Sequence, residues 1–206
     1  MVRIVAGAWR GRKLVAPPGQ GTRPTADRVR QALFDMLTHA PWGGRAVIEG
    51  AVVLDAFAGT GALGLEALSR GAATACFIEH DPAALHALRA NVAACEAERR
   101  TQVIAGDVLS TFGGRRCDRA NSARHHRLHH DETGYLAAQA SLVLLDPPYG
   151  QNLVSRALSH LSEVGRVAPG ALIVAELGRD ESWRPEDELL AERQHGAARV
   201  LVFRVA

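Results

Sequence analysis

The stretch Asp55-Ala56-Phe57-Ala58-Gly59-Thr60-Gly61-Ala62-Leu63-Gly64 decides the fold of this 206-residue chain. It overlaps the end of the run Ala51–Phe57, which is typical of a buried strand, and it opens a helical pattern over Ala62–Arg70. Its glycines are spaced G-x-G-x-x-G, and Glu79 stands 20 residues beyond Gly59, at the end of the next apolar run. This order predicts an adenosine cofactor lying across the ends of parallel strands, but it does not choose the cofactor.

Strands and helices continue to alternate along the rest of the chain. Short β-branched runs predict strands, and periodic apolar residues predict helices, one of which has Asp81 as N-cap. We therefore expect an α/β fold with a Rossmann-like, mostly parallel sheet and an antiparallel hairpin at one edge. The further strands are predicted at Ala75–Glu79, Gln102–Ala105, Ser141–Asp146 and Ala171–Glu176, a helix at Leu153–Val164, and the edge hairpin at Leu189–Gln194 and Arg199–Val205.

Residues 1–45 precede this pattern and are expected to form a basic extension. Alternating apolar residues with Gly7 and Gly11 predict a small β-hairpin, and the spacing of Val29, Leu33 and Leu37 predicts a helix over Thr25–Thr38. Residues 46–206 are then expected to form the domain that binds the cofactor. Within it, residues 113–139 carry many arginines and histidines with almost no apolar periodicity, so we expect a surface loop and no functional metal.

The charge is uneven along the chain. Residues 1–30 hold seven basic groups against one acid, a balance of +6, whereas residues 31–206 carry 17 basic and 21 acidic groups. A basic segment on a mildly acidic body suits contact with phosphates, although a solvated basic face is the alternative. No apolar run reaches the length of a membrane span, and the first residues lack a secretory signal, so we expect a soluble, cytoplasmic protein that does not bind membranes.

Carboxylates at the strand ends favour a cationic cofactor. Asp55 would repel the pyrophosphate of NAD but would attract the sulfonium and ammonium groups of S-adenosylmethionine. Asp107 follows the strand Gln102–Ala105 and reaches the same edge, where it suits the adenine amino group. The plainer alternatives are that Asp55 caps a helix and that Asp107 is an ordinary turn residue.

The second strong motif is Asp146-Pro147-Pro148-Tyr149, which ends the run Leu142–Leu145. Two prolines stop a buried strand and stiffen the following turn. Such a turn holds the Asp146 carboxylate and the Pro147 carbonyl as fixed acceptors for an exocyclic amine of a nucleobase, and Tyr149 offers a ring for stacking. A purely structural turn is the alternative.

Together the two motifs resemble those of the class I amino-methyltransferases that use S-adenosylmethionine. The segment Arg3–Arg12, followed by Arg23-Pro24-Thr25-Ala26-Asp27-Arg28-Val29-Arg30-Gln31-Ala32-Leu33-Phe34, more narrowly resembles the bacterial RsmD family. The resemblance covers nearly the whole chain. It implies methylation of the N2 amine of a guanine in 16S rRNA, either free or in a partly assembled small ribosomal subunit, by a monomeric enzyme.

The resemblance also assigns residues. It implies catalysis or base binding by Asp146, Pro147, Pro148 and Tyr149; cofactor binding by Asp55, Ala56, Phe57, Gly59, Gly61, Leu63, Glu79, His80, Asp107 and Val108; and RNA binding by Arg10, Arg12, Lys13, Arg23 and Arg28. Two features depart from the family pattern: the long segment 113–139, and His195-Gly196-Ala197-Ala198 in the last hairpin. The rival hypotheses are an adenine or cytosine amine in DNA or another RNA as substrate, an NAD-dependent oxidoreductase, and an RNA-binding module without activity.

Overall fold

A computed structural model describes residues 2–17, 24–112 and 138–206. The strands are β1 Val2–Arg3, β2 Lys13–Leu14, β3 Val52–Asp55, β4 Thr74–Glu79, β5 Thr101–Ala105, β6 Ala140–Leu145, β7 Val167–Gly178, β8 Glu188–His195 and β9 Ala198–Arg204. The α-helices are α1 Pro24–His39, α2 Ala62–Ser69, α3 Pro82–Ala94 and α5 Leu153–Glu163, and two 3-10 turns are η1 Arg45–Val47 and η2 Glu98–Arg100.

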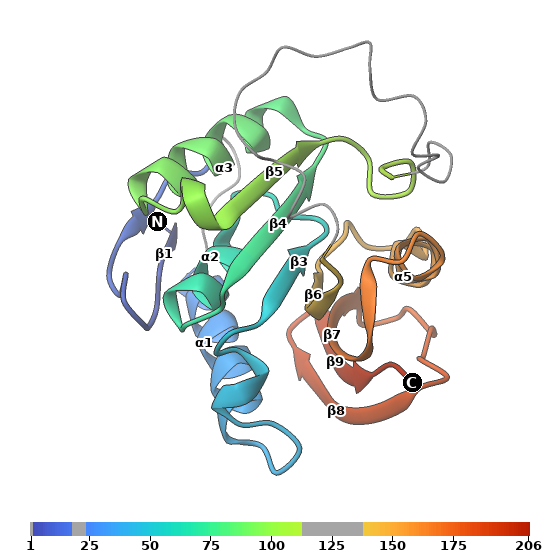
Figure 1. Ribbon diagram of the computed structural model, residues 1–206. Coiled ribbons are helices and arrows are strands. Elements are labelled where there is room, and N and C mark those ends of the chain that lie inside the picture. Colours follow the sequence, from blue (N-terminus) through green and yellow to red (C-terminus); the bar gives the residue numbers. More distant parts are fainter. Residues whose placement is uncertain (1, 18–23, 113–137) are drawn as a thin grey trace.

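The central sheet has seven strands in the order β5-β4-β3-β6-β7-β9-β8 (Figure 1). The first five are parallel to one another, and β9 and β8 form the antiparallel edge, which confirms the predicted fold. Strand β3 pairs with β4 on one side and with β6 on the other. From β3 the next strands are added on one side of the sheet, and from β6 they are added on the other. In α/β folds, ligands bind at the carboxyl ends of the two strands where this order reverses.

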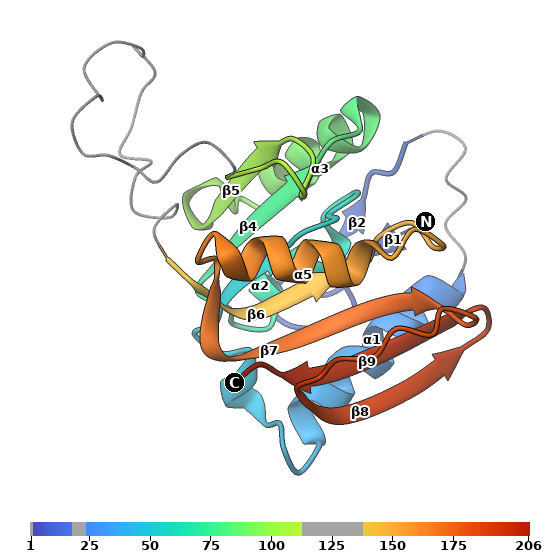
Figure 2. The same ribbon diagram turned by 90° about the vertical axis from the view of Figure 1, so that its right-hand side faces the viewer.

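Helices cover both faces of this sheet (Figures 1 and 2). Helices α1, α2 and α3 lie on one face and α5 lies on the other. Neighbouring residues of β3 show the two-residue period: Val53 packs into the core on the α1–α3 side, and Leu54 packs into the core on the α5 side. This double burial explains why the central strands are continuous apolar runs in the sequence.

Most element boundaries lie within two residues of those predicted, and β7 is the main exception. It begins at Val167, four residues before the expected start. Pro169 and Gly170 suggested a later start, but an irregularity in register opposite Ala140 and Leu142 accommodates them, and Gly170 has a φ of 73°. In the last hairpin, Gly196 has a φ of 61° and His195 pairs with Ala198, so the departure from the family pattern leaves the hairpin intact.

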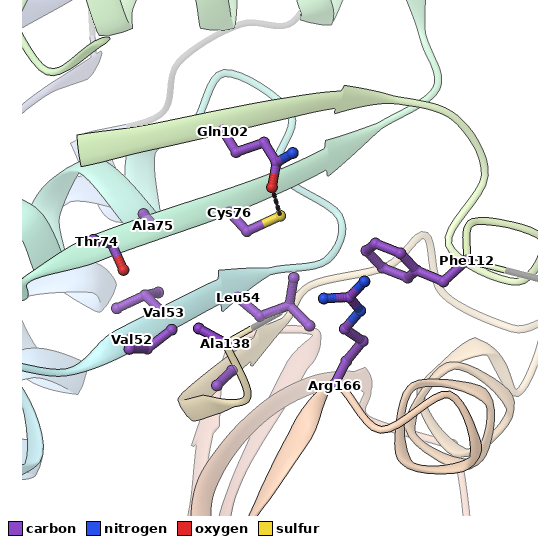
Figure 3. A pocket seen from close by; sticks show the side chains of 11 residues that line it. Val52, Val53, Leu54, Thr74, Ala75, Cys76, Gln102, Phe112, Ala138 and Arg166 are labelled. Carbon is purple, nitrogen blue, oxygen red and sulfur yellow. Dashed lines mark hydrogen bonds between the residues drawn. The ribbon is translucent and has the colours of Figure 1, made fainter. Parts of the chain in front are cut away.

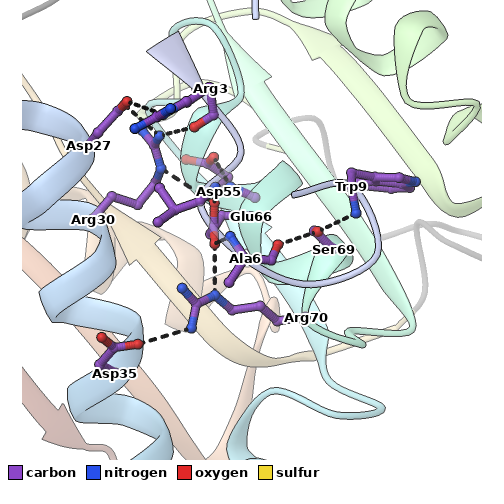
Figure 4. Close-up of polar contacts among 12 residues, drawn as sticks. Arg3, Ala6, Trp9, Asp27, Arg30, Asp35, Asp55, Glu66, Ser69 and Arg70 are labelled. Atoms are coloured by element: carbon purple, nitrogen blue, oxygen red, sulfur yellow. Dashed lines mark hydrogen bonds and ion pairs between the residues drawn. The ribbon is translucent and has the colours of Figure 1, made fainter. Parts of the chain in front are cut away.

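The N-terminal hairpin is fixed to helix α2 by a buried carboxylate (Figure 4). Glu66, fully buried on α2, accepts hydrogen bonds from the amides of Val5 (2.7 Å) and Ala6 (3.0 Å). It also pairs with Arg30 of α1 at 3.6 Å and with Arg70 at 2.8 Å. A charge buried this deeply needs such partners, so the network holds the hairpin, α1 and α2 in one arrangement.

The division at residue 45 into an extension and a catalytic domain stays a prediction. Ile4 of the hairpin and Phe34 of α1 share one apolar core with Leu65 of α2. Of the predicted surface loop 113–139, residues 113–137 lie outside the described part of the chain, as do Arg23 and the histidine cluster at 125–130. Among the described helices, none is long and apolar enough to cross a membrane.

Candidate active site

Asp55 ends β3 and lies almost completely buried. Its Oδ2 accepts a hydrogen bond of 2.9 Å from the amide of Gly64 in the first turn of α2, so the helix-capping alternative is part of its role. Its Oδ1 is also buried and has no hydrogen-bond partner among the described residues. Burial raises the pKa of Asp55 from its usual value near 3.8 to about 7, the Gly64 amide opposes this rise, and the charge of Glu79 adds to it.

An unpartnered buried oxygen of this kind suits a ligand that brings a positive charge. Desolvation disfavours the charged carboxylate, and a cation placed beside it would restore the charged form. The sulfonium and ammonium groups of S-adenosylmethionine meet this requirement. The residues at the end of β3 therefore fit the predicted cofactor.

Glu79 ends β4, beside the strand that Asp55 ends, and its carboxylate accepts three hydrogen bonds from the backbone. One oxygen accepts from the amide of Gly59 at 2.8 Å, and the other accepts from the amides of His80 (2.8 Å) and Asp81 (2.7 Å). These bonds fix the carboxylate at the strand end and tie the glycine-rich turn to β4. Lone pairs that remain on its oxygens are available for the hydroxyl groups of a ribose.

The amides of the glycine motif already have partners within the protein. Gly59 donates to Glu79, Gly61 donates to the carbonyl of Ala58 at 2.7 Å, and Gly64 donates to Asp55. A dinucleotide pyrophosphate binds through free amides at this position. Carboxylates occupy two of these amides, so the site does not fit NAD. Gly64 has a packing role as well, because a Cβ there would lie 2.4 Å from the ring of Phe77.

The other predicted cofactor residues lie along the same edge. Asp107 follows β5, is exposed, and accepts a 2.9 Å hydrogen bond from the amide of Leu109 through Oδ1, as expected of a turn residue. His80 is exposed beyond β4, and Val108 is buried. Beyond β3, Ala56 is buried, whereas Phe57 and Leu63 are partly buried.

Asp146 follows β6, the strand that pairs with β3, and so reaches the edge where Asp55 lies. Its side chain is accessible to solvent, yet the surrounding protein desolvates the carboxylate. This desolvation, together with the charges of Glu176 and Asp55, raises the pKa of Asp146 to about 7. Asp55 and Asp146 are thus close enough to influence each other, as the hypothesis of a shared site requires.

Tyr149 completes the second motif and is 46% exposed. Its hydroxyl donates a 2.5 Å hydrogen bond to Glu176 near the end of β7, and burial together with this carboxylate raises the pKa of the phenol. The hydroxyl therefore stays protonated, and the ring keeps an exposed surface.

Two carboxylates that fix the turn after β6 were not predicted from the sequence. Glu176 holds the hydroxyl of Tyr149, and Oε1 of Glu181 accepts from the amides of Gly150 (2.9 Å) and Gly178 (3.0 Å). The available signal was the place of Glu176 at the end of the predicted strand Ala171–Glu176, where a side chain reaches the same edge as Asp146.

The predicted RNA-binding residues lie on two elements. Arg10 and Lys13 in and beside the hairpin turn are exposed, Arg12 is partly buried, and Arg28 is exposed on α1. Next to them, the guanidinium of Arg100 lies 5.1 Å from the ring centre of Trp9. The role of these residues in RNA binding stays a prediction.

A pocket near the amino ends of the strands, away from the edge that carries Asp55 and Asp146, does not compete as a cofactor site (Figure 3). It lies on the sheet against β3, β4 and β5, beside Cys76 and Arg166, and has a volume of about 20 Å³. Sites for small organic ligands usually hold hundreds of cubic ångströms, so this pocket is too small. Burial raises the pKa of the Cys76 thiol to about 12, which makes it a poor nucleophile.

Comparison with known proteins decides the family. The model of the family described as "Conserved hypothetical protein 95" matches residues 2–204. The chain belongs to this family. It is the RsmD family that the sequence motifs resemble. "Ribosomal RNA small subunit methyltransferase D" of Escherichia coli strain K12 is 39% identical over 175 residues, which are 85% of this chain and 74% of the relative.

Other RsmD-like proteins agree over still more of the chain. The protein of the same name from Haemophilus influenzae is 36% identical over 199 residues, 95% of this chain and 89% of the relative. A solved structure, "Putative methyltransferase yhhF from Escherichia coli", is 33% identical and has a TM-score of 0.74, covering 99% of this chain and 97% of the other. An RNA methyltransferase from Salinibacter ruber, solved with S-adenosyl-L-homocysteine, shares the fold with a TM-score of 0.53 at 16% identity, over 90% and 93% of the two chains.

Proposed function

We propose that this RsmD-family protein uses S-adenosylmethionine to methylate the exocyclic N2 amine of a guanine in 16S rRNA. The observation that carries the proposal is the meeting of Asp55 and Asp146 at one edge of the sheet, where Oδ1 of Asp55 has no hydrogen-bond partner within residues 2–17, 24–112 and 138–206. The relatives named as small-subunit rRNA methyltransferases support RNA as the substrate. Action as a monomer in the cytoplasm stays a prediction.

When bound, S-adenosylmethionine supplies an electrophilic methyl group on a positively charged sulfur. In our proposal Asp55 and the turn 55–61 hold its methionine end, Glu79 holds the ribose, and Asp107 reaches the adenine. Asp107 has one carboxylate oxygen that accepts from the backbone, and its other oxygen is available to the amino group of the base. The protein thus fixes the cofactor with carboxylates that the backbone already orients.

The turn 146–149 would then prepare the guanine. Its exocyclic amine is a weak nucleophile because the lone pair is delocalised into the ring. The carboxylate of Asp146 and the carbonyl of Pro147 accept the two amine hydrogens, which favours a localised lone pair on nitrogen. Tyr149 stacks on the base, and Glu176 fixes the ring by holding its hydroxyl.

Methylation also releases a proton from the nitrogen. Asp146 contacts solvent and has a pKa of about 7, so it can accept this proton at neutral pH and pass it to water. A cysteine nucleophile is not required, and the partly buried Cys76, with its raised pKa, is not suited to be one.

The experiment that tests this function uses small ribosomal subunits from cells that lack the enzyme. They are incubated with the protein and labelled S-adenosylmethionine, and the labelled nucleotide is mapped and identified by mass spectrometry. We expect a single N2-methylguanine in 16S rRNA. Label on an adenine or cytosine amine would instead support the rival substrate, and the absence of any transfer would support the RNA-binding module. Calorimetry with NAD tests the oxidoreductase, for which the occupied glycine amides predict no binding.

A further inference from the structure

Asn91 joins two regions that the proposed function assigns to different ligands. It lies on α3, is 0% exposed, and has no role in the site described above. Its side-chain oxygen accepts from the amide of Val15 at 2.7 Å. Its side-chain nitrogen donates to the carbonyls of Val15 (3.0 Å) and Thr60 (2.9 Å), so both amide hydrogens are used on the backbone.

The two partners occupy informative positions. Val15 directly follows β2 in the leader, which we define as residues 2–17, and comes two residues after Lys13. Thr60 stands between Gly59 and Gly61 in the turn assigned to the cofactor. One buried amide therefore contacts both the leader and the cofactor turn.

The leader is held at Val15 by these bonds more than by apolar packing. The Val15 side chain is 55% exposed, so it buries little surface there. Moving Val15 away would leave the buried amide of Asn91 with unmet hydrogen-bonding groups, which costs free energy. The amide would then have to reorient, and its bond to Thr60 would change with it.

We propose that Asn91 is a positioning residue that couples RNA binding on the leader to cofactor binding at the turn 55–61. The inference rests on the proposed function, which supplies the two ligands. RNA phosphates on Arg12 and Lys13 favour one position of Val15, and this position favours the arrangement of Thr60 that the cofactor needs. Because coupling of this kind is reciprocal, each ligand raises the affinity for the other by the same factor.

The test measures the dissociation constant of labelled S-adenosylhomocysteine by equilibrium dialysis, with and without saturating small subunits from cells that lack the enzyme. In the wild type we expect the subunits to tighten binding by about 5- to 150-fold, the usual range for coupled sites. In Asn91→Leu, which keeps a similar volume but no amide, we expect this factor to fall to about twofold or less. Loss of the bond to Thr60 also weakens cofactor binding without subunits, so the factor is taken as the ratio of the two dissociation constants measured on the same variant.

Two further variants keep the test decisive. Val15→Pro removes the backbone N–H that donates a hydrogen bond to the side-chain oxygen of Asn91, and it leaves Asn91 in place. This variant therefore carries the test if Asn91→Leu does not fold. Ser69→Ala is the matched control, because Ser69 also fixes the leader, donating to the carbonyl of Ala6 at 2.6 Å and accepting from the amide of Trp9 at 3.0 Å. It has no bond to the cofactor turn, so we expect it to keep the wild-type factor.

A second measurement does not depend on the subunits. We expect hydrogen exchange at the Val15 amide to slow when S-adenosylhomocysteine is added to the wild type. In Asn91→Leu we expect the exchange rate to stay the same. The proposal is overturned if wild type shows no coupling, or if Asn91→Leu and Val15→Pro keep it. Loss of coupling in Ser69→Ala would also overturn it, since general loosening of the leader would then suffice. In each case the wild type still methylates its substrate, whereas failure of the proposed function removes that methylation.

Discussion

The two halves of the candidate site are built in opposite ways. On the cofactor half, Asp55 and Glu79 are buried and point their oxygens at backbone amides. On the substrate half, Asp146 and Tyr149 are exposed, and Tyr149 is held by one bond between side chains. The cofactor half is therefore preorganised by the main chain, whereas the substrate half depends on individual side chains. Variants should accordingly separate cofactor binding from methyl transfer.

The largest effect is expected from Asp146→Ala. This change removes an acceptor that orients the amine, and loss of one preorganised group of this kind lowers kcat by about 100- to 1,000-fold. Single-turnover transfer of labelled methyl groups measures the loss, and calorimetry with S-adenosylhomocysteine should show binding within about threefold of wild type, a range that allows for the usual small indirect effects. Asp180→Ala, which removes an exposed carboxylate beyond β7, is the control. Full activity in Asp146→Ala would refute its assigned role.

Asp55→Asn should have the converse effect. The amide keeps an oxygen for the amide of Gly64 but removes the charge, and a lost charged contact is worth about 1.5–3 kcal/mol, or about 10- to 100-fold in cofactor affinity. Calorimetry with S-adenosylmethionine measures the change, and kcat at saturating cofactor should fall much less. If kcat fell while affinity stayed constant, Asp55 would belong to the substrate half and the comparison would fail.

The pH dependence of cofactor affinity offers a third way to distinguish the cofactor half of the site from the substrate half. Because the pKa of Asp55 is about 7 in the free protein, S-adenosylmethionine should bind about tenfold more tightly at pH 8 than at pH 6, since binding favours the charged carboxylate. S-adenosylhomocysteine lacks the sulfonium charge and should show a smaller change. Asp55→Asn should remove most of the pH dependence, and an equal slope in that variant would assign the effect to another group.

The raised pKa of Asp55 also affects stability, but in the opposite direction: higher pH favours cofactor binding and lowers the free energy of unfolding. The native pKa of Asp55 lies above its usual value near 3.8, so between about pH 4 and pH 7 the native state binds more protons than the unfolded state. Stability contributed by the neutral carboxyl is present at low pH and is lost as pH rises through 7. Chemical denaturation should show that the free energy of unfolding falls more between pH 5 and pH 8 for the wild type than for Asp55→Asn.

Much of this arrangement could be predicted from the sequence. The β3 motif and the Asp146–Tyr149 motif each follow an apolar strand, and parallel strands bring their carboxyl ends to one edge, so the local pattern predicts that Asp55 and Asp146 reach the same edge of the sheet. The order of the sheet places β6 beside β3 although about 85 residues separate them. The resemblance to the amino-methyltransferases implied that the two motifs share a site, but no local signal brings β6 beside β3, and only the structure shows that pairing.

Other features depended on three-dimensional contacts. Glu66, Asn91 and Glu176 look like ordinary polar residues of helices or strand ends in the sequence. Their importance comes from hydrogen bonds to segments between 27 and 76 residues away in the chain. Side-chain partners at such separations depend on packing, and spacing within one element does not reveal them.

The smallest effect is expected from Tyr149→Phe, which keeps the stacking ring and loses the bond to Glu176. We expect kcat/KM to fall about two- to fivefold, the size of one exposed hydrogen bond, with Glu176→Gln causing a similar loss. If the two residues act through each other, Tyr149→Phe combined with Glu176→Gln should cost no more than either change alone. Steady-state kinetics on small subunits measures all three variants. Additive losses would mean that Glu176 acts on the site independently of the ring, and the substrate half would then be organised by charge beside Asp146 instead of by the position of Tyr149.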